Sequence, residues 1–171
     1  MADDMTSSEL GRLDGDTTLL LKIWNRRAVI ALDAHYDGAR YYGRRNNLVG
    51  IPATIFATIV GSSVFATLEK EIRLEFQIAV GVLSIAAAIL TALQTFWAYS
   101  EKAEKHRLTG ARYGAIAREL EHLLALPSDT RTANPETLTV LRRRLDGISE
   151  EAPRLPEKLW AEARKRHPKE F

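Results

Sequence analysis

Two long apolar stretches constrain the fold of this chain more than any other feature. Leu48–Leu68 and Phe76–Tyr99 contain no Asp, Glu, Lys or Arg. As helices they would be roughly 31 and 36 Å long, and the hydrocarbon core of a bilayer is about 30 Å thick. A soluble bundle is the alternative, but a chain of 171 residues can hardly wrap two helices that are apolar all round. The sequence therefore predicts two membrane spans.

The link between the spans predicts their topology. It is the seven-residue segment EKEIRLE, residues 69–75, which is short enough to force an antiparallel hairpin. Basic residues gather at the other ends of the two spans: Arg40, Arg44 and Arg45 before the first, and Lys102, Lys105, Arg107 and Arg112 after the second. Because basic residues mark the cytoplasmic side of a membrane protein, we expect a multi-pass protein with both termini in the cytoplasm.

Small residues are regularly spaced in the first span, 48–68. A row of very small side chains recurs every fourth position and would allow a second helix to approach closely: Ala53, Ala57 and Gly61. A row of hydroxyl side chains lies beside it: Thr54, Thr58 and Ser62. We expect the first row to serve close packing, and the second to brace or line whatever assembly the helix joins.

The second span, 76–99, carries a row that is still more regular, which we call the polar row. Its members are small or polar and follow a spacing of 4, 3, 4, 3 and 4 residues: Gln77, Gly81, Ser84, Ala88, Thr91 and Thr95. This spacing suits left-handed helix crossing. The row either joins the two helices of the hairpin or faces neighbouring subunits or a pore, and Ser and Thr can also bond back to their own helix. The spans contain no charge, which argues against a proton relay or an ion-coupled transporter.

The rest of the chain predicts an all-α protein with helices on the cytoplasmic side. We expect a mobile tail over 1–17, and one domain over 18–167 that includes the hairpin. Outside the hairpin its elements are an amphipathic helix over 18–47, capped by Asp16 or Thr17, a long helix over 100–126 continuing without a break from the second span, and closing helices over 135–149 and 156–166.

The residues that usually carry chemistry form no recognisable site in the sequence. Cysteine is absent, and the four histidines have no metal-ligand spacing: His35, His106, His122 and His167. His106 stands near Glu101 and Glu104, where surface ion pairing accounts for it. We expect no enzymatic activity, metal, cofactor or concave pocket. Arg142–Arg144 have no aromatic platform beside them, so no nucleic-acid partner is expected.

Three segments resemble the SLATT domain family, which comprises two-transmembrane domains associated with SMODS and SLOG proteins. They are ARYYGRRNN before the first span, EKAEKHRLTGARYGAIAREL after the second, with His106, Tyr113 and Arg118 in the usual kind of pattern, and the tail EEAPRLPEKLWAEARK. The resemblance covers roughly residues 18–167, and it lies in the combined layout rather than in any one motif.

The resemblance implies a membrane effector of bacterial conflict and antiviral defence systems. Such an effector is thought to form homo-oligomers that open a pore in, or disrupt, the inner membrane. Its trigger would be a nucleotide signal or a partner, such as a separate sensor or nucleotide-synthesising protein. A non-pore membrane anchor or regulatory scaffold, whose cytoplasmic helices bind a partner protein, is the alternative function.

Overall fold

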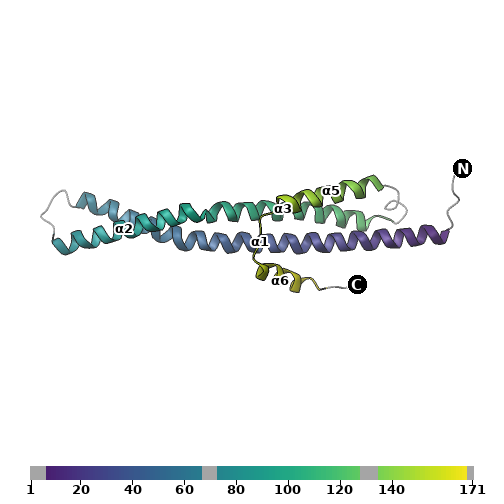
Figure 1. The fold of residues 1–171 in the computed structure, drawn as a ribbon, viewed down its shortest axis with the longest axis horizontal. Coiled ribbons are helices and arrows are strands. Elements are labelled where there is room, and N and C mark those ends of the chain that lie inside the picture. The colour runs from purple at the N-terminus through teal and green to yellow at the C-terminus, as the bar shows by residue number, and fades with distance from the viewer. Residues whose placement is uncertain (1–6, 67–72, 128–134, 169–171) are drawn as a thin grey trace. The chain divides into compact units, whose positions relative to one another are not determined.

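The computed structural model describes residues 7–66, 73–127 and 135–168, and in these ranges it is helical without any strand. The elements are α1 (Ser7–Ala66), α2 (Leu74–Trp97), α3 (Tyr99–Ala125), α5 (Pro135–Glu151) and α6 (Glu157–Arg166), which Figure 1 labels. The predicted all-α class is therefore confirmed. The closing helices were expected over 135–149 and 156–166, and the structure has them as α5 and α6.

The first helix begins earlier than the sequence indicated. We expected a tail over 1–17 and a helix capped by Asp16 or Thr17, but α1 begins at Ser7 and is helical through both of those residues. Residues 1–6 lie outside the described residues.

We had expected the predicted second span to continue into the next helix without a break, but the structure has a break between them. Ala98 separates α2 from α3 with φ 45° and ψ 43°, in the left-handed region, and its amide donates to the carbonyl of Gln94 at 3.1 Å. A left-handed residue with a side chain costs about 1–2 kcal/mol. The helix α3 then restarts at once, with the amide of Lys102 bonded to the carbonyl of Ala98.

Contacts divide the chain into two units. The four-helix unit, named for the four helices that the structure describes in it, comprises residues 1–38 and 105–171, and the hairpin unit comprises residues 39–104. The helix α1 contributes to both units. So does α3, whose first six residues belong to the hairpin unit.

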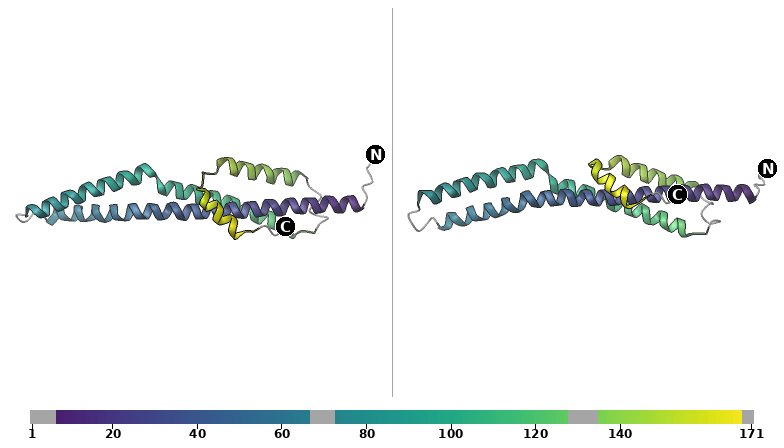
Figure 2. Two further views of the ribbon diagram at one scale, coloured as in Figure 1. Left: turned by 60° about the horizontal axis from the view of Figure 1, so that its bottom comes forward. Right: turned by 90° about the horizontal axis from the view of Figure 1, so that it is seen from below.

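The four-helix unit has a core of its own around α1. Within this unit, α3, α5 and α6 are arranged around α1 (Figures 1 and 2). The core joins buried side chains of three helices: Leu21, Ala28 and Ala31 of α1, Tyr113, Ile116, Ala117 and Leu120 of α3, and Leu141 of α5. A smaller cluster joins Ile30 and Ala34 to Ala163 of α6. The small side chains let the helices approach closely.

In the hairpin unit, α2 runs beside the last part of α1 (Figure 2). Among the side chains that the structure describes in this unit, three small ones are buried: Ala53 and Ser63 of α1 and Ala87 of α2. Half-buried residues continue the same side of α2 at heptad spacing: Val80, Leu83, Leu90, Gln94 and Trp97. A Cβ atom added at Gly50 would lie 2.9 Å from the Gln94 amide nitrogen, so these two residues mark a close approach of the helices.

The structure tests the two predicted spans unequally. In the part of the chain that it describes, one helical stretch, Leu74–Ala125, is long and apolar enough to cross a membrane, and 6% of its apolar window is buried. The first predicted span forms the end of α1 up to Ala66, and its last two residues lie outside the described residues. Of the expected link 69–75, residues 69–72 also lie outside them.

Candidate functional site

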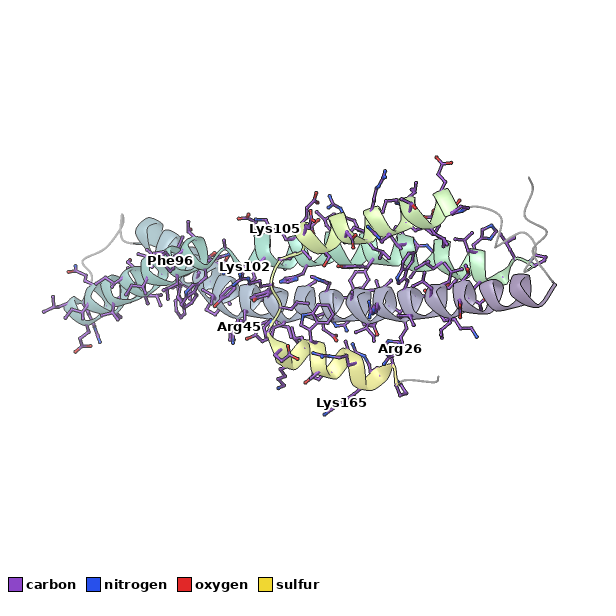
Figure 3. The ribbon with its side chains drawn as sticks, turned by 45° about the vertical axis from the view of Figure 1, so that its right-hand side comes forward. Arg26, Arg45, Phe96, Lys102, Lys105 and Lys165 are labelled. Carbon is purple, nitrogen blue, oxygen red and sulfur yellow. The ribbon has the colours of Figure 1, made fainter. Side chains whose placement is uncertain are left out.

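The hairpin unit exposes large apolar side chains on both of its helices. On α1 these are Leu48, Ile51, Ile55 and Ile59, and on α2 they are Leu74, Phe76, Ile78, Val82, Ile85, Ile89 and Phe96. Phe96, labelled in Figure 3, is 83% exposed. Soluble proteins rarely expose a contiguous apolar surface of this kind, whereas a surface in contact with lipid tails consists of such residues.

The polar row of α2 lies outside the packed side of the hairpin. Ser84 is half-buried, and the other five members are exposed: Gln77, Gly81, Ala88, Thr91 and Thr95. Leu83, Leu90 and Leu93 are half-buried instead. The packed side of α2 therefore consists of Ala87 and mostly apolar half-buried residues around it, and most of the polar row is left for another surface.

The small rows of α1 show the same division. Ala53 is buried, whereas Ala57 and Gly61, which share its row, are exposed. The hydroxyl row is exposed throughout: Thr54, Thr58 and Ser62. Only the first member of the predicted close-packing row therefore lies inside the hairpin.

Five of the six hydroxyl groups of these rows bond back to their own helices. These five donate to the carbonyl four residues earlier: Thr54 to Gly50, Thr58 to Thr54, Ser84 to Val80, Thr91 to Ala87 and Thr95 to Thr91, at 2.8–3.1 Å. A donor that is satisfied within its helix can face hydrocarbon at little cost. The oxygen atom keeps accepting capacity for a neighbouring helix or for water.

Aromatic rings and cations gather around the break at Ala98. Tyr42 of α1 stacks on Tyr99 with their ring centroids 6.2 Å apart, and the Trp97 ring lies 5.4 Å from the Tyr99 ring. Two cations lie over tyrosine rings: Arg45 over Tyr41 at 4.5 Å and Lys102 over Tyr99 at 5.7 Å (both cations are labelled in Figure 3). Tyrosine and tryptophan with basic residues are typical of the boundary between lipid and water.

The four-helix unit contains a buried histidine pair that the sequence did not reveal. His35 of α1 and His106 of α3 are 1% and 2% exposed, and their Nδ1 atoms are 3.0 Å apart. The rings of Tyr113 and Trp160 lie 5.8 and 5.9 Å from the His35 ring. Burial and the neighbouring His106 lower the pKa of His35 from 6.5 to about 4, and burial lowers the pKa of His106. Our assignment of His106 to a surface ion pair was therefore wrong.

Glycines allow the helices around this pair to approach closely. A Cβ atom at Gly38 would lie 2.5 Å from a methyl group of Leu155 and 3.2 Å from Cγ of His106. On α3, a Cβ atom at Gly110 would be 3.4 Å from the carbonyl oxygen of Leu32. These glycines, one turn from the histidines in the sequence, were the signal that could have indicated a buried helix contact.

The four-helix unit also contains a pocket, which corrects our expectation that the chain has none. Its volume is about 660 Å³, and residues of all four helices line it. Its aromatic lining consists of Trp24, Tyr113 and Trp160. Its charged lining consists of Arg26, Arg27, Arg142, Arg164, Asp146 and Glu157. Burial raises the pKa of Tyr113, and a hydrogen bond with Ser149, which also lines the pocket, opposes that change.

Three of the four pocket arginines have partners. Arg26, labelled in Figure 3, donates to the carbonyl oxygens of His167 and Pro168 at 2.7 and 3.3 Å. Arg164 pairs with Glu157, and Arg142 lies 3.7 Å from Asp146 with both side chains largely exposed. Arg27 makes no ion pair with any carboxylate among the described residues. The pocket therefore has more positive than negative charge.

Charged contacts hold the end of α6 against α1. Arg166 donates to Asp37 at 2.5 Å, and His167 lies 2.9 Å from the carboxylate of Asp33. The hydrogen bond with Asp37 raises the pKa of Arg166. Together with buried Ala163, these contacts fix α6 as one wall of the pocket.

In the part of the chain that the structure describes, no group of three or more His, Asp or Glu side chains could hold a metal ion. No family model, curated protein or solved structure matches the chain.

Proposed function

We propose that the chain is a membrane effector that assembles into homo-oligomers and permeabilises the inner membrane of a bacterium when triggered. The observation that carries the proposal is the exposed apolar surface of the hairpin unit. The predicted triggers are a nucleotide signal or a separate sensor or nucleotide-synthesising protein. The resemblance to SLATT domains supports a role in conflict or antiviral defence, and we propose no enzymatic activity.

The burial of α2 supports a membrane location. A core helix of a soluble protein is equally apolar but is largely buried, whereas Ala87 is the buried residue of α2. Burying the exposed part of Ile85 and Ile89, which are 63% and 54% exposed, would contribute about 1–2 kcal/mol each. In the proposed arrangement, both Leu48–Leu68 and α2 cross the bilayer. Both termini are cytoplasmic, because the flanking basic residues lie before the first span and after the second.

The polar row supports self-association. Inside a bilayer no hydrophobic force drives helices together, so small residues and hydroxyl groups at a helix surface provide the contact. Because the hairpin already packs through another side of α2, around Ala87, the row from Gln77 to Thr95 is available to a second copy or to a water-filled pore. Satisfied hydroxyl donors let the same row face lipid before assembly.

Leakage from liposomes tests this function. The purified chain is reconstituted at increasing protein-to-lipid ratios into vesicles loaded with a self-quenching dye. We expect dye release that rises steeply with the ratio, because assembly needs several copies. Vesicles that stay sealed at every ratio, together with no toxicity when the chain is overproduced in bacteria, would contradict the proposal.

A non-pore anchor or regulatory scaffold is the alternative, and one observation favours it. The pocket lies entirely in the four-helix unit, which is where an anchor or scaffold has its working surface. Replacing residues 48–97 by an unrelated two-span hairpin separates the two functions. An anchor retains its activity in cells after this exchange, whereas a pore former loses both toxicity and leakage.

A further inference from the structure

We propose that the pocket of the four-helix unit binds nucleoside phosphates, with the base against its tryptophans and the phosphates on its arginines. The site stands on the chemistry of its lining and does not depend on the membrane function. A volume of about 660 Å³ lies within the usual range of small-molecule sites, roughly 300–1,000 Å³.

The aromatic lining suits a planar ring. Trp24 of α1 and Trp160 of α6 both line the pocket and are half-buried, so each keeps part of its ring accessible. Stacking of a nucleobase on an aromatic side chain stabilises such complexes whatever the base. Tyr113 and Ser149 add hydroxyl groups that can bond to the base or the sugar.

The charged lining suits a phosphate group. Guanidinium groups bind phosphate oxygens through paired N–H donors, and Arg27 makes no ion pair with a described carboxylate. Arg142 is 70% exposed and lies 3.7 Å from Asp146, so it can turn to a phosphate at little cost. Asp146 and Glu157 repel a phosphate but can accept hydrogen bonds from the amino groups of a base.

Fluorescence titration tests binding directly. The chain has three tryptophans, so the substitution Trp97→Phe leaves Trp24 and Trp160 as the only reporters. The full-length Trp97→Phe protein in detergent is titrated with nucleoside monophosphates, triphosphates and cyclic nucleotides. Adenosine and inorganic phosphate are titrated separately as the two halves of the ligand. We expect saturable quenching by at least one nucleotide, with affinity at least about tenfold above that of either half.

Matched arginine variants locate the site. Arg27→Gln is expected to weaken nucleotide binding about tenfold or more, since it removes a charge-assisted contact. Arg143→Gln, an exposed α5 arginine outside the pocket, is the control and leaves binding unchanged. The site assignment is overturned if no nucleotide quenches saturably, if inorganic phosphate binds as tightly as nucleotides, or if both variants behave alike.

Occupation of the pocket should also regulate the hairpin, and this part rests on the proposed function. A ligand bridging α1, α5 and α6 would stabilise one arrangement of the four-helix unit, which Trp160 connects to His35. In dye-loaded vesicles, the bound nucleotide is expected to change the leakage rate of the parent chain but not of Arg27→Gln. If quenching is seen but leakage does not respond, the regulation is wrong and the site stands. If no vesicle leaks, the proposed function fails, and the titration still decides the site.

Discussion

The Nδ1 atom of His35 lies 3.0 Å from the Nδ1 atom of His106, inside the four-helix unit. At this distance one nitrogen donates a hydrogen to the other, so the two facing nitrogens share one proton and both rings are neutral. A further proton would place two donors face to face and bury a charge. The contact between α1 and α3 therefore depends on the protonation state of the pair.

The first prediction is a loss of stability in mild acid. Because the folded pKa of His35 is about 4 and the unfolded value is 6.5, the unfolded chain binds the proton more readily. The contribution of neutral His35 to the free energy of unfolding is complete above pH 6.5 and is lost as the pH falls toward 4. By linkage, the free energy of unfolding drops by about 2 kcal/mol between pH 7.5 and 5. Thermal unfolding followed by circular dichroism should show a midpoint lower by about 4–8 °C.

Two variants separate this effect from the titration of carboxylates. His35→Gln with His106→Gln removes the titrating pair and should flatten the pH dependence over this interval. His122→Gln, an exposed histidine on α3, should leave it as in the parent chain. An identical pH dependence in the parent and the double variant would contradict the role of the pair.

The second prediction concerns close packing at Gly38. Alanine there would place its Cβ atom 2.5 Å from Leu155 and 3.2 Å from His106, so Gly38→Ala should lower the free energy of unfolding by about 1 kcal/mol or more. Gly147→Ala is the matched control, because no atom lies within 4 Å of its added Cβ. It should raise stability by about 0.5–1 kcal/mol through helix propensity. Denaturant unfolding measures the change in the free energy of unfolding for each variant. If both changes had the same sign, the packing argument would be refuted.

The third prediction concerns the break at Ala98. Glycine adopts a φ of 45° without strain, whereas a β-branched residue there is strongly disfavoured. Ala98→Gly should therefore unfold at the same or a higher temperature than the parent, and Ala98→Val at a lower one, with about 2 kcal/mol between them. Thermal unfolding in one detergent is the measurement. Valine tolerated as well as glycine would mean that α2 and α3 form one continuous helix.

The helical elements could be predicted from the sequence because their signals are local. Pro135 and Leu138, Leu141, Leu145 and Ile148 follow helical spacing, and the last four pack on the core as that spacing indicated. The break at Ala98 could not be predicted, since neither glycine nor proline marks it. The start of α1 was missed because Asp16 and Thr17 are capping residue types that here lie inside a helix.

The candidate sites were harder to predict because they depend on contacts far apart in the sequence. His35 and His106 are 71 positions apart, and the pocket combines Trp24 with Arg142 and Trp160. The spacing of the polar row was visible in the sequence, but the sequence did not show whether the row packs inside the hairpin or faces another surface. Heptad spacing of Val80, Leu83, Ala87 and Leu90 competes with it on the same helix, and the larger side chains of Val80, Leu83 and Leu90 can bury more apolar area than the polar row.

The fourth prediction concerns the polar row. Thr91→Leu and Gly81→Leu add bulk on the exposed row and should reduce dye leakage several-fold, since they block close approach of a second copy. Ile85→Leu and Ile89→Leu change exposed apolar positions off the row and should leave leakage unchanged. Leakage assays at matched reconstitution give the comparison. Equal losses in all four variants would remove the row from the assembly.

The central claim is that the exposed apolar surface of the hairpin lies in a membrane, and cysteine labelling tests it most directly. The chain has no cysteine of its own, so Ile85→Cys, Ile89→Cys and Arg143→Cys each provide a single thiol. A membrane-impermeant maleimide is applied to intact and to opened cells. We predict that the Arg143→Cys thiol is labelled in opened cells only, while the thiols of Ile85→Cys and Ile89→Cys stay unlabelled in both. Labelling of these two thiols as fast as that of Arg143→Cys in opened cells would contradict the membrane location.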